Sequence, residues 1–182
     1  LKAGQLLLGD FGAEVHSGYA GDITRTIPVS KRFSGQQKEI YQIVLRALND
    51  SITAAKEGIA YRNIHLDAAK IIASGLKDLG IMKGDVDSAV AAGAHALFFP
   101  HGLGHLMGLN VHDMEDLGEN LVGYDEHYHR SGQFGFSSLR FGKELKAGMV
   151  LTVEPGIYFI PELIQLWKSE NKHNEFINYQ AL

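Results

Sequence analysis

The alternation of apolar and polar positions predicts a β-hairpin at the start of the chain. The run from Gln5 to Asp10 is apolar and bounded by glycines, which is typical of a buried strand. Turn-forming residues follow it, and a second strand is predicted over 19–29. The two strands and the short turn between them make up the predicted hairpin.

Two long helices are predicted next. Ser34 and Gln37 have the spacing of a capping box, and apolar residues then recur with helical periodicity. This pattern predicts a helix over 35–56, which Gly58 ends. A second helix is predicted over 61–79, which Gly80 ends.

The rest of the chain is predicted to form shorter elements. These are a helix over 86–92, a strand over 95–99, a polar loop over 115–135, strands over 149–153 and 157–160, and a helix over 162–173. Runs of strand, then helix, then strand indicate the α+β fold class.

Composition narrows the class of protein. The chain has 182 residues, of which 45% are hydrophobic and 21% charged, as expected for one globular domain. A net charge of −4 gives no sign of a nucleic-acid partner, and no apolar run is long enough to predict a membrane segment. The absence of cysteine excludes disulfides and thiolate zinc sites, and we expect a cytoplasmic protein. Because the chain starts at Leu1 without Met, we expect a piece of a longer polypeptide.

The segment 101–113 carries the densest candidate chemistry. It contains His101, His105 and His112 among glycines that disfavour a helix, so a ribbon of short strand and turn is expected. Histidine is the commonest metal ligand and titrates near neutral pH. The segment therefore predicts a metal site or an acid–base site.

Three carboxylates stand in or beside apolar strands. Asp10 ends the first strand, Asp22 lies in the second, and Glu154 interrupts the apolar run before Pro155. A buried carboxylate is costly unless it is paired or holds a cation. A pair of divalent metals bound by these carboxylates and one imidazole would satisfy all three. Such ligands suit Mn²⁺, Co²⁺ or Zn²⁺.

Each residue also has a simpler interpretation. Asp10 could be a turn former, Asp22 could pair with Arg25, and His112 with Asp113 could form an ordinary hydrogen-bonded turn. Glu154 has no comparable explanation. The carboxylates and histidines taken together indicate a metal site more specifically than any one of them alone.

Together, five stretches resemble the metallopeptidases of the pita-bread (creatinase/aminopeptidase) fold, most closely the prolidase and aminopeptidase P branch. These stretches are 10–14, 19–26, 101–113, 138–140 and 148–158. The resemblance implies that residues 1–182 are a partial catalytic domain, truncated at both ends. The amino-terminal domain and the last metal-ligand strand of the family would be absent.

The resemblance also implies a set of metal ligands. Asp10, Asp22, His105 and Glu154 would bind two divalent ions, with Mn²⁺ the first expectation and Co²⁺ or Zn²⁺ the alternatives. Asp22 would bridge the two ions, with Asp10 on one ion and His105 and Glu154 on the other.

The same resemblance implies roles around the metals. His101 and His112 would line the substrate site, and Glu154 would also carry the proton to the leaving nitrogen. Arg140 would orient the substrate or its carboxylate, because an arginine fork fits a carboxylate. Arg140 could instead be a surface residue in a basic patch with Arg130 and Lys143.

The implied function is hydrolysis of Xaa-Pro peptide bonds by a metal-activated hydroxide, most closely that of a Xaa-Pro dipeptidase. The alternatives are an aminopeptidase P and a non-catalytic peptide-binding module. The full-length protein is expected to be a homodimer whose partner is a proline-containing peptide.

The chain departs from the family pattern in two further ways. Asp10 and Asp22 are separated by one residue more than is usual, and the extra residue is expected in the hairpin turn. No segment after Tyr158 resembles the family's last bridging glutamate. We therefore expect the 182-residue chain alone to bind metal poorly and to be inactive.

Overall fold

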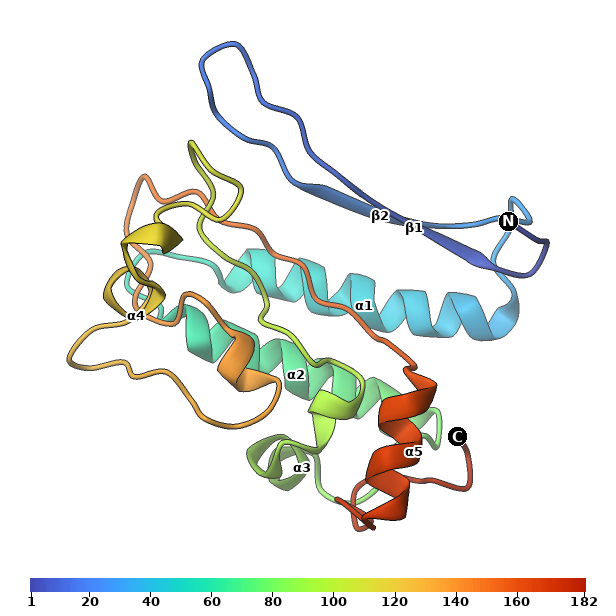
Figure 1. The fold of residues 1–182 in the computed structure, drawn as a ribbon. Coiled ribbons are helices and arrows are strands. Elements are labelled where there is room, and N and C mark those ends of the chain that lie inside the picture. The colour runs from blue at the N-terminus through green and yellow to red at the C-terminus, as the bar shows by residue number, and fades with distance from the viewer.

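The computed structural model describes all of residues 1–182 (Figure 1). Its strands and α-helices are β1 (Leu6–Phe11), β2 (Ile23–Pro28), α1 (Gly35–Ala54), α2 (Tyr61–Asp78), α3 (Val86–Ala92), α4 (Glu119–Val122) and α5 (Pro161–Ser169). Three 3₁₀ turns add η1 (Ala94–Leu97), η2 (Glu115–Leu117) and η3 (Phe136–Ser138). No helix has both the length and the apolar composition required to span a bilayer.

The two long predicted helices are confirmed. Ser34 Oγ accepts the Gln37 N–H at 3.2 Å and Gln37 Oε1 accepts the Ser34 N–H at 3.0 Å, so the capping box starts α1. Helices α1 and α2 pack alongside each other (Figure 1). A Cβ on Gly75 of α2 would lie 2.6 Å from Ile43 Cγ1 of α1, so glycine permits this close approach.

The core is built around α2. One face of this helix is fully buried, and the chain after α3 packs Leu97, Phe98 and Phe99 against the same core. The predicted strand over 95–99 is wrong, because residues 94–97 form the 3₁₀ turn η1. An apolar run this short is buried on every side, so its periodicity cannot distinguish a strand from a helical turn.

The predicted hairpin is confirmed, with β1 and β2 antiparallel and Asp10 opposite Thr24. The pairing extends to an isolated bridge between Glu14 and Ala20 in the same register. The turn closes at Gly18, which has φ 85°. The register therefore keeps Asp10 and Asp22 on one face of the ribbon.

The expectation that the first strand is buried is wrong. Leu8 is 49% exposed and Ile27 is 53% exposed, because the sheet has only two strands and no other element of the chain covers them. In Figure 1 the hairpin stands apart from the helical core, on the side of α1.

Within the glycine-rich segment, which is residues 101–113, the stretch 103–107 is extended. It lies antiparallel to the extended stretch 150–154. The Met107 N–H donates to Val150, the Thr152 N–H to His105, and the Glu154 N–H to Leu103, at 2.8–3.0 Å. The predicted strands over 149–153 and 157–160 are not regular strands, since only the bridge between Leu106 and Leu151 is formed. The short helix at 86–92 is confirmed, and the C-terminal helix is shorter than predicted.

Two histidines lie inside the core without polar partners. His65 on α2 and His95 on η1 are both 0% exposed, and none of their four ring nitrogens has a hydrogen-bond partner. Their rings are 6.5 Å apart, and His65 stacks on Phe136. Burial, followed by the charges of His95 and His101, lowers the pKa of His65 to about 3. Burial, followed by the charge of His173, lowers the pKa of His95 to about 4.

We expect the free energy of unfolding to fall as the pH decreases below about 6.5. The unfolded chain takes up protons on these histidines near that pH, whereas the folded chain does so only near the lowered pKa values. Replacing His65 with Phe removes one of these sites and should flatten the pH dependence between pH 7 and 5. Chemical denaturation across that interval measures the effect. His129→Gln, at an exposed position, is the control and should keep the wild-type slope.

Candidate metal centre

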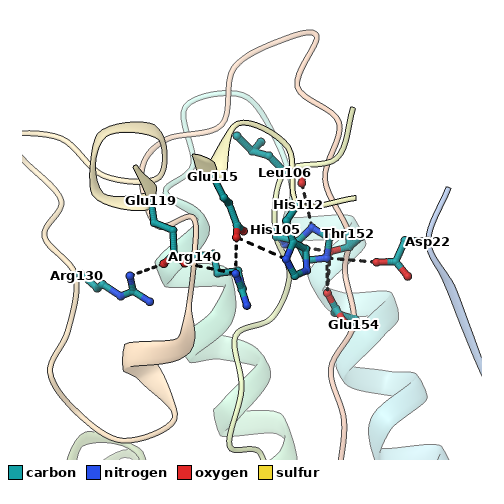
Figure 2. A network of polar contacts seen from close by, with 10 residues as sticks. All are labelled: Asp22, His105, Leu106, His112, Glu115, Glu119, Arg130, Arg140, Thr152 and Glu154. Carbon is teal, nitrogen blue, oxygen red and sulfur yellow. Dashed lines mark hydrogen bonds and ion pairs between the residues drawn. The ribbon is translucent and has the colours of Figure 1, made fainter. Parts of the chain in front are cut away.

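Two carboxylates and one imidazole converge at one point of the structure. Asp22, His105 and Glu154 each offer a ligand atom, and these atoms lie within 4.8 Å of one another. His105 Nε2 is 3.3 Å from Asp22 Oδ2 and 3.3 Å from Glu154 Oε1 (Figure 2). The three side chains come from the hairpin, the glycine-rich segment and the segment before Pro155.

The pairing of 103–107 with 150–154 places His105 beside Glu154. The His105 N–H donates to Thr152 Oγ1 at 3.0 Å, and that hydroxyl donates to Glu154 Oε1 at 2.9 Å. A Cβ on Gly104 would lie 2.1 Å from the Thr152 carbonyl oxygen, so this spacing requires glycine. The Tyr61 hydroxyl of α2 donates to the same carbonyl at 2.6 Å and ties the pairing to the core.

The imidazole of His105 is oriented for ligation. Its Nδ1 lies 3.0 Å from the Leu106 carbonyl oxygen, a contact in which Nδ1–H donates. Nε2 then faces the two carboxylates. A metal-binding histidine typically has this arrangement, because a carbonyl that accepts from one nitrogen fixes the tautomer and leaves the other nitrogen for the ion.

One backbone hydrogen bond brings the hairpin to this site. The Ala20 N–H donates to the Gly108 carbonyl at 2.8 Å, which places the residues just before β2 against the glycine-rich segment. Asp22 lies two residues further along the chain and is partly buried. Asp10 is exposed and lies beside Asp22, where it contributes to the pKa of that carboxyl without joining the group of three.

The site holds more negative charge than it can balance. Burial, followed by the charges of Asp10 and Glu154, raises the pKa of Asp22, although His105 opposes the shift. Burial lowers the pKa of His105, but hydrogen bonds with Glu154 and the Leu106 carbonyl, together with the charges of Glu154 and Asp22, outweigh burial, so the pKa is raised overall. Burial likewise raises the pKa of Glu154, but hydrogen bonds from His105 and Thr152 outweigh it, so the pKa is lowered. A cation would relieve this repulsion.

The other predicted site residues lie around this group. The His112 ring packs edge-on against the His105 ring, with centroids 4.2 Å apart. The His101 ring packs edge-on against the Tyr158 ring, with centroids 5.3 Å apart. The charge of His101 contributes to lowering the pKa of Glu154. Arg140 forms ion pairs with Glu115 and Glu119 (Figure 2).

The simpler interpretations of two residues are not what the structure shows. The Arg25 side chain donates to the Thr24 carbonyl at 2.8 Å and forms no ion pair with Asp22. Asp113 accepts the Asn110 N–H at 3.2 Å, so the turn after the glycine-rich segment forms without the His112 side chain.

Sequence reasoning missed Glu115 and Thr152. Glu115 lies in the segment predicted to be a polar loop, although its spacing from His112 matches one helical turn and the two side chains approach to 3.6 Å. Thr152 precedes Glu154 by two positions, which in extended chain puts both side chains on one face. These two spacings are the signals that could have identified them.

The sequence model of metallopeptidase family M24 matches residues 1–174 of the chain. The chain belongs to this family. The predicted α+β, pita-bread fold and the predicted family are thereby confirmed.

Named members of M24 align with nearly the whole chain. The Xaa-Pro dipeptidase of Homo sapiens is 38% identical over 182 residues, covering 100% of this chain and 35% of the human protein. The Xaa-Pro aminopeptidase of Escherichia coli is 43% identical over 162 residues, covering 89% of this chain and 32% of that protein. The chain thus spans about a third of the length of these relatives.

Solved M24 structures agree in fold. Zinc-substituted Escherichia coli aminopeptidase P in complex with product is 42% identical with a TM-score of 0.73, over 90% of this chain and 32% of that one. Proline aminopeptidase P II from Yersinia pestis gives 42% identity and a TM-score of 0.73, over 90% and 33%.

We expect the 182-residue chain to bind Mn²⁺ weakly, with no more than one ion per chain, because only three ligand groups converge. His105→Ala should abolish this binding, since it removes the nitrogen that faces both carboxylates. Titration calorimetry measures both, with His129→Ala at an exposed position as the control. Tight binding of two ions per chain would contradict the expectation.

Proposed function

We propose that this chain carries the catalytic site of a dinuclear-metal peptidase that cleaves the peptide bond before proline, with Xaa-Pro dipeptides as its substrates. The observation that carries the proposal is the convergence of Asp22, His105 and Glu154 in a member of family M24. The names of the relatives, Xaa-Pro dipeptidase and Xaa-Pro aminopeptidase, support the substrate class.

The ligand set fits divalent metals. Two carboxylates and an imidazole are hard to borderline ligands, which suit Mn²⁺, Co²⁺ or Zn²⁺. Asp22, His105 and Glu154 would hold one ion, and Asp10, beside Asp22, would contribute to a second. We propose Mn²⁺ as the native metal. When bound, a metal pair lowers the pKa of a water molecule and polarises the scissile carbonyl.

The chain's own residues supply proton transfer and orientation. The proline nitrogen of a Xaa-Pro bond must gain a proton to leave, and the Glu154 carboxylate is the group proposed to deliver it. His112, packed against His105, would donate to the oxyanion of the tetrahedral intermediate. His101 would line the proline side, and Arg140 would hold the substrate carboxylate through its fork.

Aminopeptidase P activity is the second candidate. It is favoured by the likeness to the Escherichia coli and Yersinia pestis enzymes, whose names state that activity. In the substrate of a dipeptidase, the proline after the scissile bond is the last residue. In the substrate of an aminopeptidase P, the chain continues beyond that proline. Arg140, whose side chain is 38% exposed, favours the dipeptide because it can pair with a terminal carboxylate.

We expect the full-length protein, assayed with Mn²⁺, to cleave Gly-Pro faster than Gly-Pro-Ala. Glu154→Gln should lower kcat/KM by about 100-fold or more, because general acid–base catalysis contributes on that scale. Release of proline measured by chromatography reports the rate.

Glu162→Gln, at an exposed carboxylate on α5, is the matched control and should retain wild-type activity. Faster cleavage of Gly-Pro-Ala than of Gly-Pro would favour aminopeptidase P. No cleavage of either peptide with Mn²⁺, Co²⁺ or Zn²⁺ would refute the proposed function.

A further inference from the structure

Glu115 joins two groups that the proposed function uses separately. One of its carboxylate oxygens, Oε2, lies 3.6 Å from His112 Nδ1 and also pairs with Nη1 of Arg140 (Figure 2). His112 in turn packs against His105 with ring centroids 4.2 Å apart. A continuous series of side chains therefore links the candidate metal ligand to Arg140.

The environment of Glu115 indicates more than a surface ion pair. Its side chain is 18% exposed, and its second oxygen, Oε1, is buried without a hydrogen-bond partner. Leaving a buried carboxylate oxygen unpaired costs free energy, so a residue chosen for stability alone would not leave it unpaired. Glu115 instead makes its contacts with both His112 and Arg140 through its other oxygen, Oε2.

Arg140 is held on one side only. Both of its carboxylate partners, Glu115 and Glu119, contact Nη1, and its Nε and Nη2 have no partner within the chain. An arginine edge with two parallel N–H groups is the geometry that binds a carboxylate in bidentate fashion. The backbone beside Arg140 is fixed, because the Tyr124 hydroxyl donates to the Leu139 carbonyl at 2.6 Å.

Glu119 cannot replace Glu115 in this role. It lies 3.4 Å from Arg140 and is shared with Arg130, whose Nε donates to the Ser137 carbonyl at 2.9 Å. Two arginines and two glutamates leave the array with no net charge. A substrate carboxylate would therefore be recognised through the direction of the Arg140 fork rather than through excess positive charge.

We propose that Glu115 is a positioning residue that orients Arg140 and His112 together, so that the free edge of Arg140 receives the terminal carboxylate of a Xaa-Pro dipeptide. This inference rests on the proposed function. It makes Glu115 a determinant of preference for substrates that end at proline, although Glu115 itself touches neither the substrate nor the metals.

The test compares Gly-Pro with Gly-Pro-amide, which lacks the carboxylate, in the full-length protein with Mn²⁺. Glu115→Ala should raise KM for Gly-Pro roughly tenfold, the scale of one charge-assisted hydrogen bond, and leave KM for the amide unchanged. The kcat values should fall by the same factor for both substrates, because misorientation of His112 affects both. Glu115→Gln keeps the side-chain shape and should give a smaller effect in the same direction.

A double-mutant cycle separates positioning from a purely structural role. In an Arg140→Ala background, Glu115→Ala should cause no further rise in KM for Gly-Pro, because the group it orients is gone. Glu126→Ala is the matched control, since Glu126 is 85% exposed and pairs only with its neighbour His127. Equal changes in KM for both substrates, or an additive rise in the double mutant, would overturn the inference while leaving the proposed function intact.

If the wild-type protein cleaves neither substrate, the proposed function fails and binding decides the inference. Calorimetry with Gly-Pro and its amide is then compared between wild type and Glu115→Ala. Weaker binding of Gly-Pro alone supports the positioning role. Unchanged binding of Gly-Pro, or no binding to the wild type, refutes it.

Discussion

The antiparallel pairing of 103–107 with 150–154 is the constraint on which the candidate site depends. It places His105 and Glu154 on neighbouring segments and brings Thr152 between them. The absent side chain of Gly104 allows the segments to approach, and the Tyr61 hydroxyl anchors them to α2. Because α2 contributes more buried residues than any other helix, the ligand-bearing segments are tied directly to the core, as a site that must hold its geometry requires.

Electrostatic repulsion explains why this anchoring of the ligand-bearing segments matters. Asp22 and Glu154 would separate if their side chains were free, since each raises the free energy of the other's charge. The fold opposes that separation with backbone hydrogen bonds and the His105 imidazole. A few side chains away, Arg130 and Arg140 balance Glu119 and Glu115. The molecule thus places an unbalanced anionic group, suited to cations, beside a balanced array suited to directional recognition.

The sequence predicted the parts of the fold that local signals govern. The capping box at Ser34 and the helical periodicity after it set α1, and the position of Gly80 set the end of α2. Asp10, Asp22 and Glu154 stand out in the sequence because carboxylates in apolar strands need an explanation, whereas the choice of His105 as the imidazole ligand came from the family resemblance. The structure gathers Asp22, His105 and Glu154, with Asp10 close by.

Other features could not be predicted because they depend on contacts between distant segments. The turn at 94–97 is buried on all sides, so its conformation depends on its packing. The exposure of β1 reflects which elements lie over the hairpin, and that is not a property of its own residues. In the sequence, Glu115 is one acidic residue of a polar segment, and its ion pair with Arg140 depends on the fold.

The hydroxyl of Thr152 has a consequence for the chemistry of its neighbour. Its oxygen accepts the His105 N–H, and its single proton is directed to Glu154 Oε1. That hydrogen bond makes the two oxygens of Glu154 inequivalent, because it stabilises the charge on Oε1. A proton carried by Glu154 is therefore favoured on Oε2, so an uncharged side chain distinguishes two oxygens that are equivalent in a free carboxylate.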